Sequence, residues 1–350
     1  MADGGGITVR PCRADDERGV LELFQRSFGR PLSAEHWRWK LLRPSTIENA
    51  WLATSENKPI FHYAGIPTRF LLAQAPVDMM VSVDTMTAPE FRRRGLLTQV
   101  AAQVYAAWRA AQVAFVIGLP NQQWGSRAAA LGWERLFPLQ WLVRPLRPEA
   151  ILARRLNLPV LARVAAPGRL WNRFLDRRLR SDHGLQLMAI GNADQAFDQL
   201  WQRCKSDWMF STVRDSAWID WRFFSAPSRS YQVTLARRGG VPAGYAVHTH
   251  GGAAARTHAC LAELFVGRAD TATRDALLRE VLGKVQEEGA VWLSALAIPG
   301  TPLFRRLRQL GFIPQQAFSV QLVPLRDGLP LDLMREPDHW SLSGADFDVV

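Results

Sequence analysis

The sequence contains few cysteines, and it has no hydrophobic run long enough to cross a membrane. The three cysteines, Cys12, Cys204 and Cys260, are odd in number and far apart, which excludes a disulfide framework and a four-cysteine zinc site. No apolar run approaches the roughly 20 residues that span a bilayer, and the first residues lack the basic-then-apolar order of a signal peptide. We therefore expect a cytoplasmic protein without a metal cofactor.

The sequence also lacks the motifs of nucleic-acid-binding proteins, although its net charge is +11 and its isoelectric point is near 10.5. It contains no helix-turn-helix, zinc-finger spacing or RNA-recognition motif, and its arginines concentrate in the centre of the chain. Specific binding to nucleic acid is therefore not expected. The 350 residues, of which 48% are hydrophobic, are enough for two globular domains with substantial cores.

One stretch, residues 81–105, has the pattern of a strand, a basic turn and the start of a helix. Residues 81–87 favour a strand, and apolar residues recur every four positions from Leu96 to Trp108. Between them lies Arg92-Arg-Arg-Gly95. The glycine permits close backbone approach, and the free N–H groups of the first helical turn attract anions together with the helix dipole and the arginines. This turn is a predicted site for a phosphate or pyrophosphate.

The same stretch resembles the acetyl-coenzyme A signature of the GCN5-related N-acetyltransferase (GNAT) superfamily. In that family a turn with the pattern Gln/Arg-x-x-Gly-x-Gly/Ala precedes a helix; Arg92 and Gly95 match it, whereas Leu97 does not. Residues further along support the resemblance. Residues 114–119 predict a short apolar strand, and residues 121–133 are similar to the family's Asn…Leu-Gly-Phe ending.

The resemblance implies a set of contacts with acetyl-coenzyme A as acyl donor. The pantetheine arm is expected to pair with backbone near Met86 and Thr87, and the pyrophosphate with residues 92–97. Asn121 and Ser126 are further contacts, with helix capping as the other role open to Asn121. The expected cofactor-binding residues are Met86, Thr87, Arg92, Arg93, Arg94, Gly95, Leu96, Leu97, Asn121 and Ser126.

An amine attacks the thioester directly in this family, so the site needs a base for the amine proton. Asp84 is the first candidate because it lies on the central strand near the expected thioester, and Glu90 and His62 are the others. The alternatives are that Asp84 pairs with an arginine, that Glu90 caps the helix and that His62 is an ordinary strand residue. The family's acidic tyrosine falls at Ala128, which leaves Tyr105 or water as the acid, or a protein that binds the cofactor without catalysis.

Tryptophans are numerous in the first half of the chain, and each belongs either to the core or to a cleft for the acceptor. Aromatic faces in such a cleft suit sugars or aromatic amines. The candidates are Trp37, Trp39, Trp124, Trp133 and Trp141.

The second half of the chain repeats the first at a fixed offset of 179 residues, which takes Asp84 to Glu263. The same offset takes Gly65, Pro120, Leu131, Gly132 and Pro145 to Gly244, Pro299, Leu310, Gly311 and Pro324. An uninterrupted offset across the same pattern of strands and helices indicates a duplicated domain.

The second copy lacks the anion-binding turn of the first. The offset takes Arg92 to Thr271 and Gly95 to Arg274, so the arginine trio and the glycine are both lost. An arginine side chain at the glycine position would hinder close approach of a pyrophosphate. We expect a lobe that keeps the fold without the cofactor; its open roles are to wall the acceptor cleft, to form a homodimer or to stabilise the first lobe.

The predicted domains are an acetyl-coenzyme A-binding GNAT domain over residues 1–146, a basic helical linker over 147–184, a degenerate GNAT-like domain over 185–326 and a C-terminal extension over 327–350. The linker is either a solvated connector or, through residues 147–180, a basic amphipathic contact with a peripheral membrane or an anionic polymer. The extension is expected to be loosely structured and packed by Trp340. Its Trp…Gly-Asp-x-Asp ending resembles tandem acetyltransferases associated with bacterial exopolysaccharide biosynthesis.

These observations together predict an α/β (α+β) protein of two tandem acyl-CoA N-acyltransferase (GNAT) folds, each with a mixed, mostly antiparallel central sheet flanked by helices. The predicted function is transfer of an acetyl group from acetyl-coenzyme A to an amine of a small molecule or amino sugar by direct attack. Two alternatives stay open. One is Fem-type transfer to a peptide or carrier, and the other is a non-catalytic coenzyme A sensor or scaffold in polysaccharide assembly.

Overall fold

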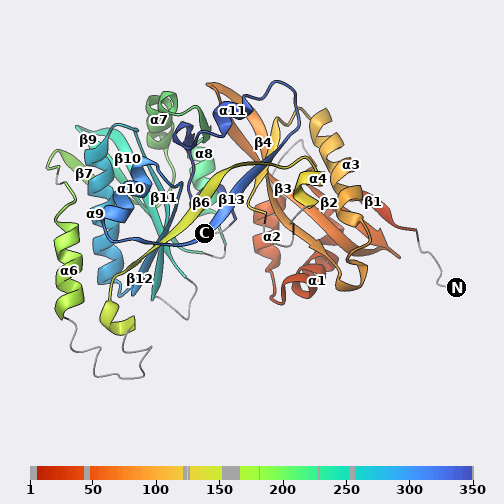
Figure 1. The fold of residues 1–350 in the computed structure, drawn as a ribbon, viewed down its shortest axis with the longest axis horizontal. Helices are drawn as coiled ribbons and strands as arrows, with labels where there is room; N and C mark the ends of the chain where they lie inside the picture. The colour runs from red at the N-terminus through yellow and green to blue at the C-terminus, as the bar shows by residue number, and fades with distance from the viewer. Residues whose placement is uncertain are drawn as a thin grey trace. The chain divides into compact units, whose positions relative to one another are not determined.

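The computed structural model describes residues 6–42, 48–120, 124, 127–151, 166–180, 182–227, 229–251 and 257–348 (Figure 1). Its chain forms two compact units. The first contains Met1–Leu136 and Ser319–Arg335, and the second contains Phe137–Phe318 and Glu336–Val350. The units differ from the linear domains predicted from sequence, because a late segment joins the first unit and the C-terminal residues join the second.

The first half of the chain supplies a β-sheet and the helices around it. Its described strands are β1 (Thr8–Pro11), β2 (Ala50–Ser55), β3 (Lys58–Leu72), β4 (Ala75–Thr87), β5 (Phe115–Gly118) and β6 (Glu134–Pro145). Its described helices of at least four residues are α1 (Glu17–Phe28), α2 (Ala34–Leu41), α3 (Leu96–Ala110) and α4 (Arg127–Ala130).

After the helix α6 (Ala166–Asp176), the second half follows a similar order of elements, with the short β8, α11 and β14 in addition. Its described strands are β7 (Leu185–Ile190), β8 (Phe210–Thr212), β9 (Tyr231–Arg238), β10 (Val241–His250), β11 (His258–Val266), β12 (Trp292–Ala297), β13 (Ile313–Pro324) and β14 (Trp340–Ser341). Its described helices of at least four residues are α7 (Gln195–Cys204), α8 (Ser216–Ile219), α9 (Thr271–Glu287), α10 (Pro302–Gln309) and α11 (Leu331–Met334), with a π-helical segment at Asp220–Phe224.

Each unit is completed by a strand from the other half of the chain. In the first unit the strands follow the order β1-β2-β3-β4-β5, and the end of β13 pairs with β5 through Gln321 and Gly118. In the second unit the order is β12-β11-β10-β9-β7, and the end of β6 pairs with β12 through Gln140 and Ala297. This exchange of last strands explains why the compact units do not follow linear boundaries.

The predicted fold class is confirmed, since the sheet is mostly antiparallel with helices on its faces. The parallel pairs among the described strands are β4 with β5, β11 with β12, and β14 with β8. The turn before the last strand of each half requires a left-handed glycine, with φ of 81° at Gly132 and 85° at Gly311. These glycines are one of the sequence pairs related by the offset. Among the described residues, no helix is both long and apolar enough to cross a membrane.

The apolar patterns of the sequence become the cores of the two units. In the first unit Val20, Leu23 and Phe24 of α1 are buried, as the predicted helical face requires. In the second unit α9 packs on the sheet through Leu277, Val281 and other buried residues that form one cluster with Ala246 and Ala259. Burial of such side chains contributes about 25 cal/mol per Å² of apolar surface.

Candidate functional site

The candidate site of the first unit is a gap between β4 and β5. The two parallel strands pair at Met80–Val116 and Val81–Ile117, but β4 continues to Thr87 without a further described pair to β5. The strands diverge there and leave a pocket with an empty volume of about 520 Å³. The residues that line it are Phe28, Ser82, Val83, Asp84, Thr85, Gly118, Leu119, Pro120, Trp124 and Trp133.

A β-bulge at Asp84 accompanies the divergence. Along β3 the pairing moves from His62–Met86 to Ala64–Val83, so Asp84 and the next residue together face a single partner residue. Asp84 has φ of 47°, an uncommon conformation for a residue other than glycine. Bulges of this kind bend a strand and redirect side chains, and they are frequent beside active sites. The bulge puts the Asp84 residue on the wall of the pocket.

Asp84 forms an ion pair inside the unit. The Nζ atom of Lys40 on α2 lies 2.7 Å from Asp84 Oδ2, and their side chains are 2% and 10% exposed. The sequence leaves a pair with an arginine open, but the partner is a lysine that sequence reasoning missed. The sequence feature that could have identified Lys40 is its position on α2, where it lies on the same buried face as Trp37 and Leu41. A lysine on such a face requires a buried partner.

His62 lies behind Asp84 and does not line the pocket. Its Nδ1 atom is 2.8 Å from the backbone oxygen of Asp84, and the side chain is fully buried. Burial lowers the pKa of the His62 imidazole, so the ring is neutral at physiological pH. His62 therefore supports the bulge and does not face the space where a substrate would lie.

The turn from Arg92 to Gly95 is exposed at the start of α3. Its three arginines and the glycine are all solvent-exposed, and Gly95 has φ of 77° with no atom within 4 Å of the place where a Cβ would stand. Arg94 lies over the ring of Phe91 at 4.9 Å, and Arg92 Nε is 3.4 Å from the backbone oxygen of Thr87. The first amides of the 15-residue helix have no partner within it, so the turn is open to an anion.

A buried hydroxyl chain leads away from the pocket. Ser82 Oγ lies 3.4 Å from the hydroxyl of Tyr63, which is 2.9 Å from the hydroxyl of Tyr105. The indole of Trp133 donates to Tyr105 at 3.0 Å. Burial raises the pKa of Tyr105 to about 12 and that of Tyr63 well above its usual value. Tyr105, the candidate acid, is thus a buried neutral phenol that does not line the pocket.

The other predicted residues fall in different places. Glu90 is half-exposed and pairs with Arg26 at 2.6 Å, which lowers the pKa of its carboxyl; it does not line the pocket. Met86 is buried and Thr87 is partly buried, on β4 between the pocket and the basic turn. Asn121 and Ser126 lie outside the described residues.

Two of the five candidate tryptophans, Trp124 and Trp133, line the pocket, and their rings meet edge to face at 5.5 Å. Trp37 is a core residue, 1% exposed, and Trp141 belongs to the second unit, where it pairs with Leu296.

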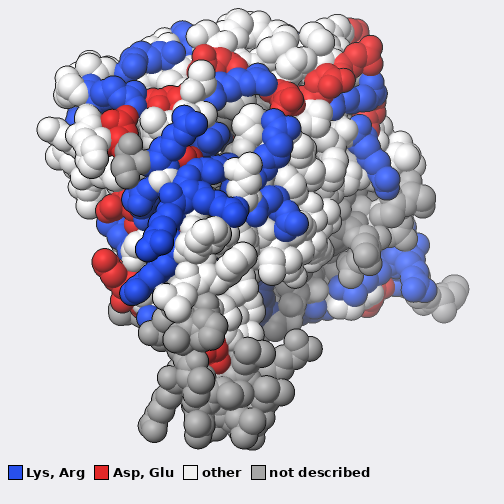
Figure 2. Space-filling model, turned by 60° about the vertical axis from the view of Figure 1, so that its left-hand side comes forward, with Lys and Arg blue, Asp and Glu red and all other residues white. Residues whose placement is uncertain are grey.

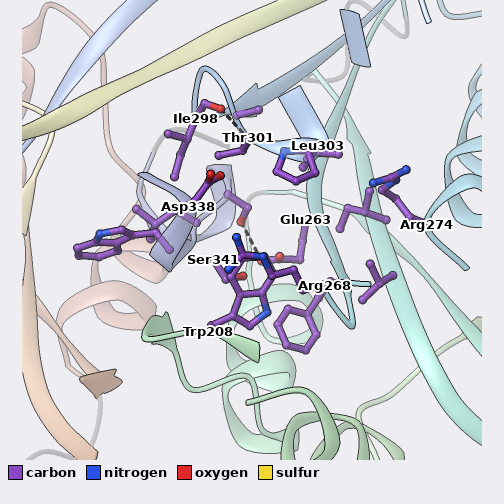
Figure 3. Close-up of a pocket in the computed structure, with 17 residues that line it drawn as sticks. Trp208, Glu263, Arg268, Arg274, Ile298, Thr301, Leu303, Asp338 and Ser341 are labelled. Carbon is purple, nitrogen blue, oxygen red and sulfur yellow. Dashed lines mark hydrogen bonds between the residues drawn. The ribbon is translucent and has the colours of Figure 1, made fainter. Parts of the chain in front are cut away.

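The second unit has a gap at the corresponding place, between β11 and β12. Pairing ends at Leu261–Ala295, although β11 continues to Val266. Here the C-terminal segment that includes Trp340 and Ser343 lines the space together with the strands (Figure 3). The remaining pocket has an empty volume of about 770 Å³. Trp340 packs the C-terminal extension as expected, since it is 2% exposed and meets the rings of Phe137 and Phe210.

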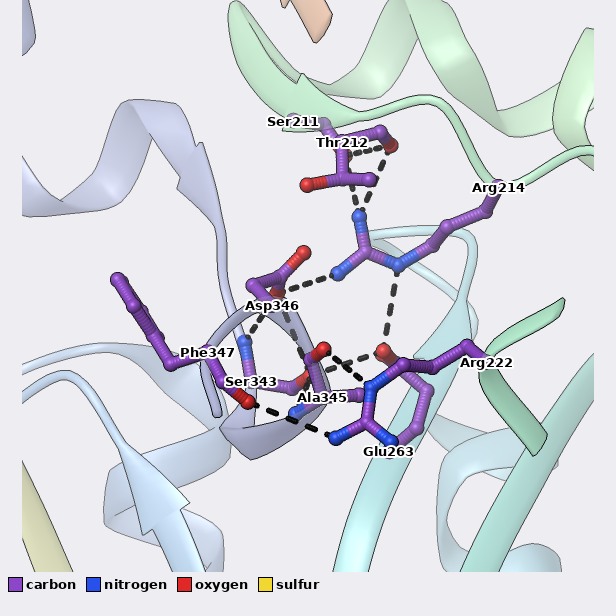
Figure 4. A network of polar contacts seen from close by, with 9 residues as sticks. All are labelled: Ser211, Thr212, Arg214, Arg222, Glu263, Ser343, Ala345, Asp346 and Phe347. Atoms are coloured by element: carbon purple, nitrogen blue, oxygen red, sulfur yellow. Dashed lines mark hydrogen bonds and ion pairs between the residues drawn. The ribbon is translucent and has the colours of Figure 1, made fainter. Parts of the chain in front are cut away.

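A buried ionic network ties the C-terminal segment to this gap (Figure 4). Arg214 is 1% exposed, and its guanidinium lies 2.8 Å from Asp346 Oδ2 and 3.4 Å from Glu263 Oε1. Ser343 Oγ donates to Glu263 Oε2 at 2.8 Å. Glu263, which corresponds to Asp84, is therefore fixed by its neighbours on both carboxylate oxygens.

The turn before α9 differs from the turn before α3. Asp270 caps α9, and its carboxylate accepts from the backbone N–H of Thr273 at 3.0 Å. Arg238 pairs with the same carboxylate at 3.0 Å. A carboxylate of the chain thus already occupies the start of this helix, where the first unit leaves the amides open.

Comparison with known proteins agrees with this geometry. Residues 8–135 match the family model described as an acetyltransferase (GNAT) domain. No curated protein sequence matches the chain. Similar solved structures include a probable N-acyltransferase from Enterococcus faecalis V583, which is 12% identical with a TM-score of 0.67, covering 91% of this chain and 72% of that one.

Two further structures have the same fold. A GCN5-related N-acetyltransferase from Anabaena variabilis ATCC 29413 is 12% identical with a TM-score of 0.66, over 92% of this chain and 73% of that chain. An N-myristoyltransferase from Saccharomyces cerevisiae with bound myristoyl-CoA is 11% identical with a TM-score of 0.60, over 92% and 84%. At such identities the likeness concerns the fold. Residues 8–135 are thus similar to an acetyltransferase (GNAT) domain, and the solved structures agree with the chain in fold.

Proposed function

We propose that the first unit transfers an acetyl group from acetyl-coenzyme A to the amine of a small molecule or amino sugar. The observation that supports the proposal is that β4 leads from the pocket at Asp84 toward the exposed basic turn, Arg92–Gly95, which follows it in the chain. The amides and arginines of the turn would bind the pyrophosphate. The free backbone of the diverging strand would pair with the pantetheine arm, which ends with the thioester beside the bulge.

In this proposal the acceptor amine attacks the thioester carbonyl, and Asp84 accepts its proton directly or through one water. Lys40 holds the carboxylate in place at 2.7 Å. The carbon–sulfur bond then breaks, and coenzyme A leaves as a thiolate. Tyr105 is a poor donor to that thiolate, because burial raises its pKa to about 12, so solvent water is the proposed proton source.

An amino sugar fits the proposed acceptor side of the pocket. Phe28, Trp124 and Trp133 present aromatic surface there, and such faces pack well on the C–H surfaces of sugar rings. An amino sugar of a surface polysaccharide is the acceptor that agrees with the resemblance of the C-terminal ending. The three cysteines are free thiols, which fits a reducing compartment such as the cytoplasm.

For the second unit we propose a duplicated GNAT fold that has lost acetyl-coenzyme A. The offset of 179 residues relates β6 to β13 end to end, since it takes Glu134–Pro145 to Ile313–Pro324. The sealed carboxylate Glu263 and the capped start of α9 support the loss of the cofactor. The unit then serves as support for the first.

Thiol release measures this function directly. The purified chain with acetyl-coenzyme A should release coenzyme A when amino sugars or other small amines are added, and release should depend on the acceptor. Release only with peptides or aminoacylated carriers would favour Fem-type transfer instead. Binding of acetyl-coenzyme A without release across a broad amine panel would favour the sensor or scaffold.

A second proposed property is contact with an anionic membrane surface through α6. Leu170 and Trp171 are each 60% exposed and Phe174 is 49% exposed, and the two rings stack at 5.7 Å. Exposed arginines occur along the same segment, and Figure 2 shows Lys and Arg gathered on one face of the molecule. The exposed arginines of the described part of this segment are Arg173, Arg177, Arg178 and Arg180. Each such cation near an anionic leaflet contributes about 1 kcal/mol.

Co-sedimentation with phosphatidylserine vesicles tests the membrane contact. Wild type should sediment at low salt and less at high salt, and a Trp171→Ser, Phe174→Ser variant should bind several-fold more weakly. Vesicles of neutral lipid are the control. Equal sedimentation of wild type and variant, or none at low salt, would contradict the contact.

A further inference from the structure

Two histidines interrupt the apolar face of β10 in the second unit. Ala246, His248 and His250 alternate along the strand, so they point to the same side of the sheet. Ala246 packs in the core cluster with Val281 and Val285 of α9, so this is the side that α9 covers. His248 is fully buried at a position where the pattern would place an apolar residue.

A carboxylate of the helix end meets these two imidazoles. Glu288 directly follows α9, and its Oε2 atom lies 3.8 Å from His248 Nε2 and in contact with His250 Nε2. One ligand atom from each of the three residues lies within 4.8 Å of the others. The second oxygen of Glu288 accepts from Gln232 Nε2 at 2.6 Å, which orients the carboxylate.

His248 has no hydrogen-bond partner on either ring nitrogen, although it is buried. Leaving a buried polar group unsatisfied costs about 1–3 kcal/mol, so an unpartnered imidazole in a core requires an explanation. A simple ion pair between His250 and Glu288 would leave His248 without a role.

We propose that His248, His250 and Glu288 bind a divalent late first-row transition metal, with zinc as the representative ion. Two imidazoles and one carboxylate are ligands that zinc accepts, and tetrahedral bonds of about 2.0–2.1 Å place ligand atoms about 3.4 Å apart. The three ligand atoms lie within 4.8 Å of one another, so side-chain rotations would bring them to that separation. Three protein ligands leave a fourth position for water or another small ligand.

The surroundings permit metal entry and retention. The side chains of His250 and Glu288 are 18% and 31% exposed, so the site opens to solvent at the end of β10, whereas His248 closes its inner side. The nearby ammonium of Lys284 is engaged with Thr234 Oγ1 and Glu280 Oε1, each at 3.2 Å. A bound metal would join the end of α9 to β10.

Calorimetry with zinc chloride on the tag-free, chelator-treated full chain tests this site. Wild type should bind one zinc ion, and its thermal midpoint should rise when zinc is added. A His250→Gln, Glu288→Gln variant, changed only at the partly exposed side of the site, should bind at least about 100-fold more weakly. His258→Gln is the matched control, because this exposed histidine on the neighbouring β11 contacts Ser294 instead.

The outcomes decide the proposal. Cobalt(II) should give the intense visible absorption of a four-coordinate site in wild type and in the control, but not in the double variant. Should the double variant fold poorly by circular dichroism, Glu288→Gln alone must still weaken zinc binding. The absence of saturable zinc binding by wild type, or equal affinity in wild type and the Glu288 variants, would overturn the proposal.

Discussion

The two gaps, β4–β5 in the first unit and β11–β12 in the second, arise from the same order of elements but contain different groups. In the first, the pocket is open and Asp84 faces it beside a buried lysine. In the second, the chain's own C-terminal segment enters the space, and Arg214 and Ser343 fix Glu263. The fold leaves a space between two diverging strands. The side chains that lie in this space decide whether a ligand can bind there.

The helix starts beside the gaps differ in the same way. Gly95 is exposed with open space around it, whereas Asp270 caps the second helix with its own carboxylate. A free helix start attracts an anion, and a capped start no longer needs one.

The largest expected effect concerns the ionic network that fixes Glu263 in the second gap. Arg214→Met leaves the carboxylates of Glu263 and Asp346 buried without their cation, which should lower the free energy of unfolding by about 3–5 kcal/mol. Arg335→Met is the matched control; its pair with Glu134 is exposed, and its loss should cost less than about 1 kcal/mol. Denaturant unfolding measures both, and equal losses would contradict a sealing role for Arg214.

The next effect concerns catalysis in the first gap. Asp84→Asn should lower the rate of thiol release about 10²–10³-fold, with acetyl-coenzyme A affinity changed less than about threefold. Because the neutral amide would leave the buried ammonium of Lys40 without its anionic partner, a Lys40→Met, Asp84→Asn variant serves as the control. A double variant that recovers wild-type turnover would show that the ion pair matters for structure only, and unchanged turnover in Asp84→Asn would exclude Asp84 as the base.

A smaller effect is expected for the cofactor turn. Gly95→Glu adds a negative charge and a side chain at a backbone with φ of 77°, and it should weaken acetyl-coenzyme A binding about 100-fold, or about 2.7 kcal/mol. Thr271→Glu adds the same charge at the turn of the second unit, where binding should not change. Titration by calorimetry gives both affinities. Equal weakening by the two substitutions would remove the assignment of the cofactor to the first unit.

The smallest effect is a pH dependence from the histidine behind the first gap. Burial lowers the folded-state pKa of His62 below its ordinary value of 6.5, so the unfolded chain binds this proton more readily. The contribution of His62 to the free energy of unfolding is present above pH 6.5. It decreases as the pH is lowered, by at most about 1.4 kcal/mol per pH unit. The midpoint temperature of thermal unfolding should decrease when the pH is lowered from about 7.5 to about 5.5. The decrease should be smaller in His62→Gln than in wild type. The same fall in both would contradict this account.

The sequence predicted the parts of the site that depend on local pattern. The turn from Arg92 to Gly95 follows from a glycine and arginines between a strand and a helix, and both elements occur where expected. The fixed offset likewise predicts that the second half repeats the first and lacks this turn, and the duplication stays a prediction. These features are encoded by neighbouring residues, so they can be recognised without a structure.

Features that depend on distant contacts could not be predicted in the same way. The ion pair of Lys40 with Asp84 joins a helix to a strand far along the chain, and the bulge depends on how β3 and β4 pair. The C-terminal segment has no strong periodicity, yet Trp340 and Asp346 are buried in the second unit. A prediction that divides the chain into consecutive segments cannot represent the exchange of β6 and β13 between the two units.

The number of acetyl-coenzyme A molecules bound per chain tests the central claim most directly. Calorimetric titration of wild type should give one molecule per chain, and the same titration of Gly95→Glu should show binding about 100-fold weaker. Two molecules per chain, or one molecule that still binds with wild-type affinity in Gly95→Glu, would contradict the account of one cofactor site per chain, in the first unit.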